Sequence, residues 1–119
     1  MEKKMYTKEE IAQIAFSLIV HAGDAKSQAQ QAISASNIYD FKKADSFIEQ
    51  ANVEIKEAHE IQTKIVQAEA GGTDYEVTVL LVHAQDHFAM AMTAIDVAKQ
   101  MIQMNKRIQD LEKKIGGDV

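Results

Sequence analysis

Residues 79–93 have a helical pattern in which apolar side chains fall on two separate sides. An α-helix advances by about 100° per residue, so residues cluster into stripes along its surface. The first stripe contains Leu81, Ala84, Phe88, Ala91, Ile95, Ala98 and Ile102. The second stripe, on nearly the opposite side, contains Val79, Val82, Asp86, Met90, Thr93, Val97, Met101 and Met104. A small bundle can cover one such stripe, so we expect the first to face the chain's own core and the second to face another chain.

Apolar spacing and end signals predict three long helices, at about residues 7–36, 41–70 and 75–114. Thr7 followed by Glu10 fits a capping box, and Asp40 can cap the second helix. The pair Gly71-Gly72 fits a helix end and a turn. Short turns between long helices predict an all-α fold, an antiparallel up-down-up three-helix bundle. Gly23 falls inside the first helix, where we expect a close contact with another helix.

The second stripe predicts self-association through the third helix. It continues with apolar residues to the expected end of that helix, at Ile108, Leu111 and Ile115. Asp86 is a polar residue inside this stripe, and such a residue is a known device for fixing register and oligomer number. The pattern therefore predicts a homo-oligomer, whereas it does not give the number of copies.

Composition supports this interpretation and excludes several classes of protein. The 119 residues include no proline and five glycines, which fits one helical domain spanning residues 1–119. The chain has no cysteine, and residues 1–6 lack the apolar run of a signal peptide, so we expect a cytoplasmic protein. No apolar stretch is long and charge-free enough to span a bilayer. The net charge of −5 without a basic stripe argues against nucleic-acid binding.

His83 is the strongest candidate for chemistry. It lies with His87, four residues later, on the boundary between the two stripes. An imidazole that is neutral near pH 7 has a free ring nitrogen, which can accept a phosphoryl group and pass it on. A boundary position would place His83 in a groove between subunits, where a partner could reach it. An isolated helical histidine is more often a packing residue, but the neighbouring Gln85, Asp86 and His87 favour a functional site.

Each neighbour of His83 has a different expected role. Gln85 points about 200° away from His83, so it could assist the His83 of a neighbouring copy but not its own. Asp86 is costly to bury alone, and copies brought together by symmetry would repel one another. Shared protons or a bound cation would relieve that repulsion. A hydrogen bond from Asp86 to a histidine or water explains an aspartate in this stripe equally well.

Two other functions fit parts of the pattern. Histidines at i and i+4, such as His83 and His87, can bind zinc, but Ala84 stands where a zinc hydrolase has its glutamate base. A purely structural or adaptor oligomer would use the same histidines for packing.

The segment His83-Ala84-Gln85-Asp86-His87 resembles the active-site segment of a known family. That family is the enzyme IIA component of the lactose, cellobiose and chitobiose branch of the bacterial sugar phosphotransferase system. Segments 22–27, 43–46 and 57–63 resemble the family's first and second helices, and the likeness covers residues 7–106 in one register. Ala84 is typical of cellobiose- and chitobiose-type members, where lactose-type members more often have glycine. After His87, Phe88-Ala89-Met90 replaces the family's usual Leu-Met-Thr.

The resemblance implies a homotrimer of three-helix subunits acting as a cytoplasmic phosphocarrier. It implies that His83 accepts a phosphoryl group from the histidine phosphocarrier protein and passes it to a cysteine of enzyme IIB. It also implies that Asp86 helps to bind a divalent cation, which we expect to be Mg²⁺, near the trimer axis. Gln85 and His87 would lie close to the phosphohistidine. The membrane would be involved only through the permease subunit, which selects the sugar, so the sequence does not identify the sugar.

Overall fold

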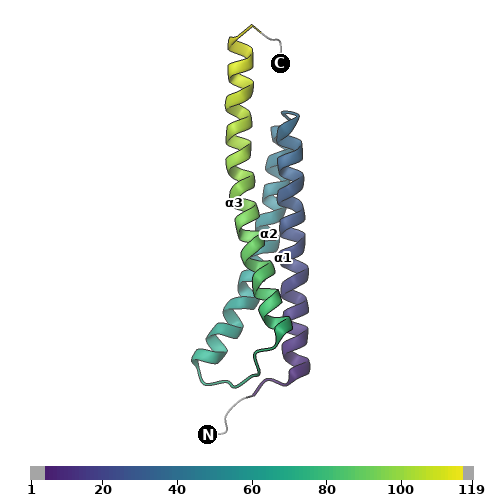
Figure 1. Cartoon of the computed structure of the whole chain (residues 1–119), viewed down its shortest axis with the longest axis vertical. Helices are drawn as coiled ribbons and strands as arrows, with labels where there is room; N and C mark the ends of the chain where they lie inside the picture. Colours follow the sequence, from purple (N-terminus) through teal and green to yellow (C-terminus); the bar gives the residue numbers. More distant parts are fainter. Residues whose placement is uncertain (1–4, 117–119) are drawn as a thin grey trace.

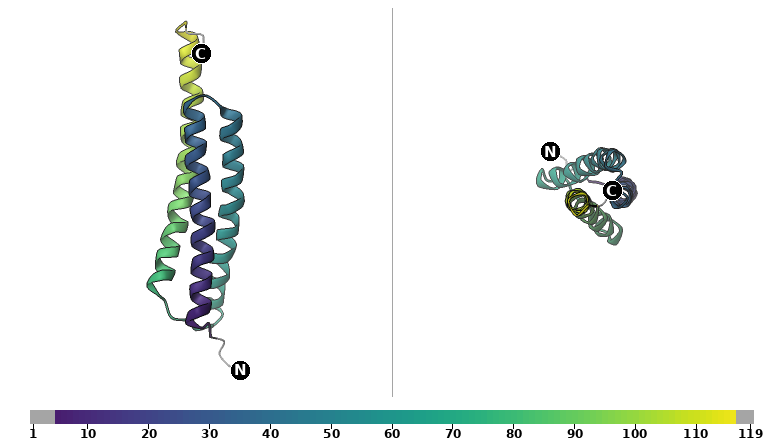
Figure 2. Two further views of the ribbon diagram at one scale, coloured as in Figure 1. Left: turned by 90° about the vertical axis from the view of Figure 1, so that its right-hand side faces the viewer. Right: turned by 90° about the horizontal axis from the view of Figure 1, so that it is seen from above.

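Three helices make up almost all of the computed structural model, which describes residues 5–116. They are α1 (Lys8–Asn37), α2 (Phe41–Ala70) and α3 (Val79–Lys114). The chain runs up, down and up through them, and α1 packs extensively against both other helices, as Figures 1 and 2 show. The all-α three-helix prediction is confirmed. Within residues 5–116, no helix is long and apolar enough to cross a membrane.

Alanines repeated every seven residues form the centre of the bundle. Each helix contributes three fully buried alanines at this spacing: Ala15, Ala22 and Ala29; Ala44, Ala51 and Ala58; Ala84, Ala91 and Ala98. Small side chains let helix axes approach closely, and a seven-residue repeat keeps the same face inward along the helix. Larger side chains such as Ile11, Leu18 and Phe88 fill the spaces between the alanines. Because each helix keeps its buried alanines on one face over several turns, the three helices pack side by side along their length.

Polar side chains fix the helix ends as the sequence indicates. Thr7 and Glu10 form both hydrogen bonds of a capping box at the start of α1. The Asp40 carboxylate accepts a hydrogen bond from the Lys43 backbone N–H at the start of α2. Gly71 caps the end of α2, and Gly72 follows with a φ of +95°, a conformation that favours glycine. Because these caps are local, the sequence alone predicts them.

The third helix begins four residues later than the predicted residue 75. Its N-cap is Thr78, whose hydroxyl accepts a hydrogen bond from the Leu81 N–H at 3.0 Å. The preceding segment is extended: the Tyr6 N–H donates to the Asp74 carbonyl at 2.9 Å, and the Tyr6 and Tyr75 rings lie 6.3 Å apart. The linker therefore lies against the start of the chain, and α3 begins only after its Thr78 N-cap.

The prediction of a close helix contact at Gly23 is wrong within this chain. A Cβ atom added at Gly23 would meet no atom within 4 Å. The glycine lies on an open face of α1, between the buried Ala22 and the exposed Asp24. The helix tolerates it because the rest of α1 is held by packing.

The end of α1 and the turn after it contact α3 through polar and aromatic side chains. The Asn105 amide donates to the Ser36 hydroxyl and to the Asn37 side chain, both at 2.9 Å. Tyr39, with a φ of +64°, donates its hydroxyl hydrogen to Glu112 at 2.7 Å. This hydrogen bond to a carboxylate raises the pKa of the Tyr39 phenol above its usual value of 10.0. These contacts fix α3 against the turn, and α3 then extends beyond it (Figure 1).

Candidate functional site

The two stripes of α3 have the different environments that the pattern predicts. All seven residues of the first stripe, from Leu81 to Ile102, are buried against α1 and α2. Residues of the second stripe stay at the surface of the single chain: Val82 is 57% exposed, Met90 43% and Val97 46%. The second stripe is therefore an apolar surface that this chain does not cover itself.

His83 and His87 form a pair on the boundary between the stripes. Their Nε2 atoms lie 3.1 Å apart, and their rings meet edge to face with centroids at 4.6 Å. His83 is exposed and His87 is half-buried. One Nε2 must carry a hydrogen and donate it while the other accepts. The spacing of four residues thus gives direct contact between two rings, of which His83 is the more accessible.

Gln85 lies on the other side of α3, toward α2. Its side-chain oxygen accepts a hydrogen bond from the Gln62 amide at 3.3 Å. Gln85 makes no contact with His83 of the same chain, as the helical geometry predicts. Gln62 interrupts the apolar pattern of the second helix, and its hydrogen bond with Gln85 explains why a polar residue stands there. In the sequence, that interruption is the only sign of the contact.

Asp86 is exposed on the second stripe, between Val82 and Met90. In residues 5–116 of one chain, no group of three histidine, aspartate or glutamate side chains is placed to hold a metal ion. A single carboxylate does not supply the six or more oxygen ligands that Mg²⁺ or Ca²⁺ takes. A cation site at Asp86 would therefore need carboxylates from other copies.

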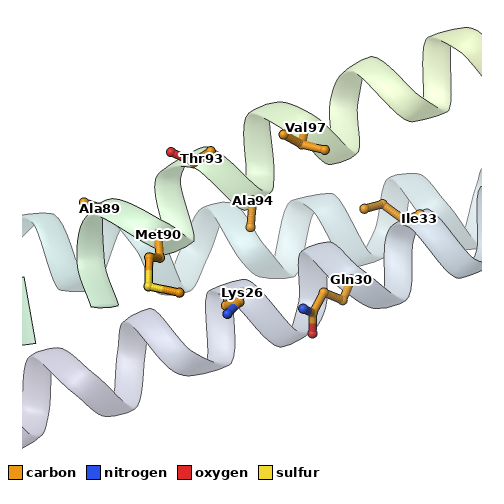
Figure 3. Close-up of a pocket in the computed structure, with 8 residues that line it drawn as sticks. All are labelled: Lys26, Gln30, Ile33, Ala89, Met90, Thr93, Ala94 and Val97. Atoms are coloured by element: carbon orange, nitrogen blue, oxygen red, sulfur yellow. The ribbon is translucent and has the colours of Figure 1, made fainter. Parts of the chain in front are cut away.

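An apolar groove of about 490 Å³ runs beside the second stripe, between α1 and α3. Figure 3 shows Met90, Thr93 and Val97 of α3 on one side, with Lys26 and Gln30 of α1 on the other. Ile33, Ala89 and Ala94 complete the lining. The groove shares Met90, Thr93 and Val97 with the second stripe, so the two surfaces adjoin each other.

The remaining histidines have structural partners on other helices. His21 Nδ1 lies 2.7 Å from Glu54 Oε2, which joins α1 to α2. The exposed His59 packs its ring on Phe88 with centroids 6.0 Å apart. Local spacing along one helix could not reveal either contact, because each partner lies about 30 residues away in sequence. Neither histidine contacts the pair on α3.

Comparison with known proteins gives one consistent result. Residues 13–106 match the sequence model of the phosphotransferase system lactose/cellobiose-specific IIA subunit. The lactose-specific EIIA component of Lacticaseibacillus casei is 44% identical over 92% of this chain and 98% of its own. The lichenan-specific phosphotransferase enzyme IIA component of Bacillus subtilis is 41% identical over 86% of this chain and 93% of its own.

Solved structures agree with the sequence comparisons. The cellobiose-specific enzyme IIA of Bacillus anthracis superposes with a TM-score of 0.82 at 38% identity, over 89% of this chain and 95% of that one. The chitobiose IIA of Escherichia coli, solved in complex with HPr, gives a TM-score of 0.72 at 29% identity, over 84% of this chain and 97% of that one. The chain therefore belongs to the lactose/cellobiose-specific IIA subunit family of the phosphotransferase system.

Proposed function

We propose that this chain is a phosphocarrier in which His83 receives a phosphoryl group from the histidine phosphocarrier protein and passes it to a cysteine of enzyme IIB. The observation that carries the proposal is the exposed His83 ring, paired with His87 at 3.1 Å on the boundary of an apolar surface. Family membership supports the phosphotransfer role, and the E. coli relative solved with HPr supports this choice of donor. The transfer would serve uptake of a β-linked disaccharide of the cellobiose or chitobiose type.

The proposed transfer needs a neutral His83 ring with a free nitrogen. The lone pair of that nitrogen attacks the phosphorus of the donor phosphohistidine, and the donor's phosphorus–nitrogen bond breaks. The donor imidazole keeps the electron pair of that bond. In the second step, a cysteine thiolate of enzyme IIB attacks the phosphorus, and the electron pair of the broken bond returns to His83. The group is handed on without a net gain or loss of electrons.

His87 and Gln85 would support the phosphoryl group from different chains. Because His87 Nε2 is within hydrogen-bonding distance of His83 Nε2, it can orient the ring and donate to a phosphoryl oxygen. Gln85 faces α2 in its own chain. A role for Gln85 near His83 therefore requires the His83 of an adjacent copy.

The proposed assembly is a homotrimer through α3, with the second stripes facing a common axis. Its support is the exposed apolar stripe and the groove beside it, an apolar surface that a monomer would leave in water. Three Asp86 carboxylates near that axis would repel one another unless a cation or shared protons intervened. A divalent cation, Mg²⁺ by our expectation, would be held by these carboxylates and would neutralise their charge.

Labelling with phosphate tests the function directly. The wild-type chain, given the upstream phosphorylation enzymes and labelled phosphoenolpyruvate, should acquire an acid-labile, base-stable label, as a phosphohistidine does. The variant His83→Gln should remain unlabelled. A matched control is His59→Gln, which alters an exposed histidine outside the pair and should label normally. Persistent labelling of His83→Gln would overturn the assignment.

The same experiment separates the proposal from a structural or adaptor role. An adaptor with packing histidines would acquire no label in any variant, and His83→Ala would leave its function intact. A metal-dependent hydrolase would bind zinc stoichiometrically and lose activity to chelators. The outcomes of the three proposals do not overlap.

A further inference from the structure

A hydrogen bond joins two glutamine side chains across α2 and α3. The Gln62 amide nitrogen donates to the Gln85 side-chain oxygen at 3.3 Å. Gln62 lies between the buried Ala58 and Ile65, on the face of α2 that turns toward the bundle. An apolar side chain would continue that face without a desolvation cost, so packing alone does not account for a glutamine at this position.

The hydrogen bond fixes the orientation of the Gln85 amide. A side-chain amide accepts hydrogen bonds at its oxygen and donates them at its nitrogen. Because the Gln85 oxygen is turned toward Gln62, the nitrogen occupies the other branch of the same planar group. A free glutamine side chain would sample both orientations and several rotamers, and ordering it would cost conformational entropy. The nitrogen is therefore the end of Gln85 that is held ready to donate to a ligand.

The two glutamines lie beside an open cavity between α2 and α3. Both are half-buried and line this cavity of about 490 Å³, in which Phe88 forms part of the apolar lining. The His59 ring packs on Phe88 with centroids 6.0 Å apart, one helical turn before Gln62. Asp96, which also lines the cavity, is eleven residues from Gln85 along α3, about 16 Å at 1.5 Å per residue. The Gln85 amide is thus accessible from outside the bundle and held from inside by Gln62.

We propose that Gln62 is a positioning residue for phosphoryl transfer, which holds Gln85 so that its amide nitrogen donates to an oxygen of the phosphoryl group. Because the proposed function places Gln85 beside the His83 of an adjacent copy, this role of Gln62 rests on it. Phosphoryl oxygens are negatively charged acceptors, so an N–H donor stabilises them and an amide oxygen repels them. The orientation of one amide therefore determines whether Gln85 favours or opposes the transfer.

Three substitutions at Gln62 test the orientation of Gln85. Gln62→Lys can only donate, so it keeps the Gln85 oxygen turned inward and should transfer within about threefold of the wild-type rate. Gln62→Met forms no hydrogen bond, which leaves Gln85 free to rotate and should slow transfer by about three- to fivefold. Gln62→Glu has a carboxylate that only accepts, so it should turn the Gln85 nitrogen inward and slow transfer by more than about tenfold.

Rapid-quench labelling of His83 from the phosphorylated donor protein measures these rates. Gln62 does not touch the donor in this proposal, so the maximal rate should fall while the donor concentration for half-maximal rate stays unchanged. Gln67→Glu is the matched control, which makes the same charge change at an exposed position of α2 and should transfer at the wild-type rate. Thermal melts show whether each variant is folded, since unfolding lowers the labelled fraction and not the rate. Equal rates for Gln62→Glu and Gln67→Glu would overturn the proposal.

A double-mutant cycle separates the orientation of Gln85 from the effect of charge. In a Gln85→Met background there is no amide to orient, so Gln62→Glu and Gln62→Lys should both transfer at the rate of Gln85→Met alone. A direct effect of the introduced charge on the phosphoryl group would persist in that background. Persistence of the full Gln62→Glu defect without Gln85 would therefore contradict a positioning role.

Mixed assemblies test whether the glutamine pair acts on a neighbouring copy. A His83→Gln chain accepts no label in the proposed mechanism but still carries Gln62 and Gln85. Added in excess to Gln62→Glu chains, it should restore their labelling rate, because most neighbours then supply an intact pair. A chain with both His83→Gln and Gln62→Glu is the control and should restore nothing. Failure of the rescue, once native mass spectrometry has shown that subunits exchange, would overturn the proposal.

The outcomes distinguish this proposal from the proposed function. If His83→Gln still acquires label, the assignment of the phosphoacceptor fails, and the positioning role of Gln62 fails with it. If His83→Gln is unlabelled while Gln85→Met transfers at the wild-type rate, Gln85 does not touch the phosphoryl group. That result would refute the role of Gln62 and leave His83 as the phosphoacceptor.

Discussion

Replacement of Asp86 by leucine should stabilise the assembled protein more than the isolated chain. Asp86 is exposed in the single chain, so its carboxylate remains hydrated there. It is flanked by Val82 and Met90 on the second stripe, and association through that stripe would remove the carboxylate from water. The cost of desolvation therefore arises only on association, and Asp86→Leu removes it.

The expected rise in melting temperature follows from the burial of one carboxylate per chain. Replacing buried ionic groups by apolar residues of similar volume is often neutral or stabilising by about 1–4 kcal/mol. For a domain of this size, 1 kcal/mol corresponds to a change of about 4 °C in the melting temperature. We therefore expect Asp86→Leu to melt about 4–15 °C higher than the wild type in the absence of divalent cations.

Thermal melts should be recorded at two protein concentrations, with and without Mg²⁺. Because the effect depends on association, the difference between Asp86→Leu and wild type should shrink on dilution. If the wild type binds the cation at Asp86, Mg²⁺ should raise its melting temperature and leave that of Asp86→Leu unchanged. Asp86→Asn is the control that removes the charge and keeps a polar side chain of the same shape.

A lower melting temperature for Asp86→Leu in both conditions would refute this reasoning. It would show that Asp86 contributes favourable interactions that exceed its desolvation cost. If the difference in melting temperature between Asp86→Leu and the wild type does not change on dilution, Asp86 acts within the single chain.

Two more substitutions test the site and the open face of α1. His87→Ala should leave the fold intact and slow phosphoryl transfer through His83 by about 5–10-fold, the value of one hydrogen bond of about 1 kcal/mol, measured by rapid-quench labelling. An unchanged rate would remove His87 from the proposed mechanism. Gly23→Ala should raise the free energy of unfolding in urea by about 0.5–1 kcal/mol, because nothing lies within 4 Å of the new methyl group. A loss of stability that increases with protein concentration would place Gly23 in a contact between copies.

The sequence predicted the contacts that join residues close to one another along the chain. The capping box of Thr7 and Glu10, the Asp40 cap and the contact of His83 with His87 all join residues three or four positions apart. The separation of α3 into a buried and an exposed stripe also follows from helical periodicity alone. Helical periodicity likewise places His83 beside His87 and turns Gln85 toward α2, as their hydrogen bonds show, while the roles of these three residues remain predictions.

The features that the sequence did not reveal depend on contacts between distant segments. The extended linker before the Thr78 N-cap of α3 lies against the start of the chain, where the Tyr6 N–H donates to the Asp74 carbonyl. The contact of Gln62 with Gln85 joins two helices, and the open surroundings of Gly23 depend on how α1 is placed between its neighbours. Helix periodicity specifies which side of a helix is apolar. Only the packed bundle determines which residues of α1 and α2 cover the first stripe of α3, while the second stripe stays exposed.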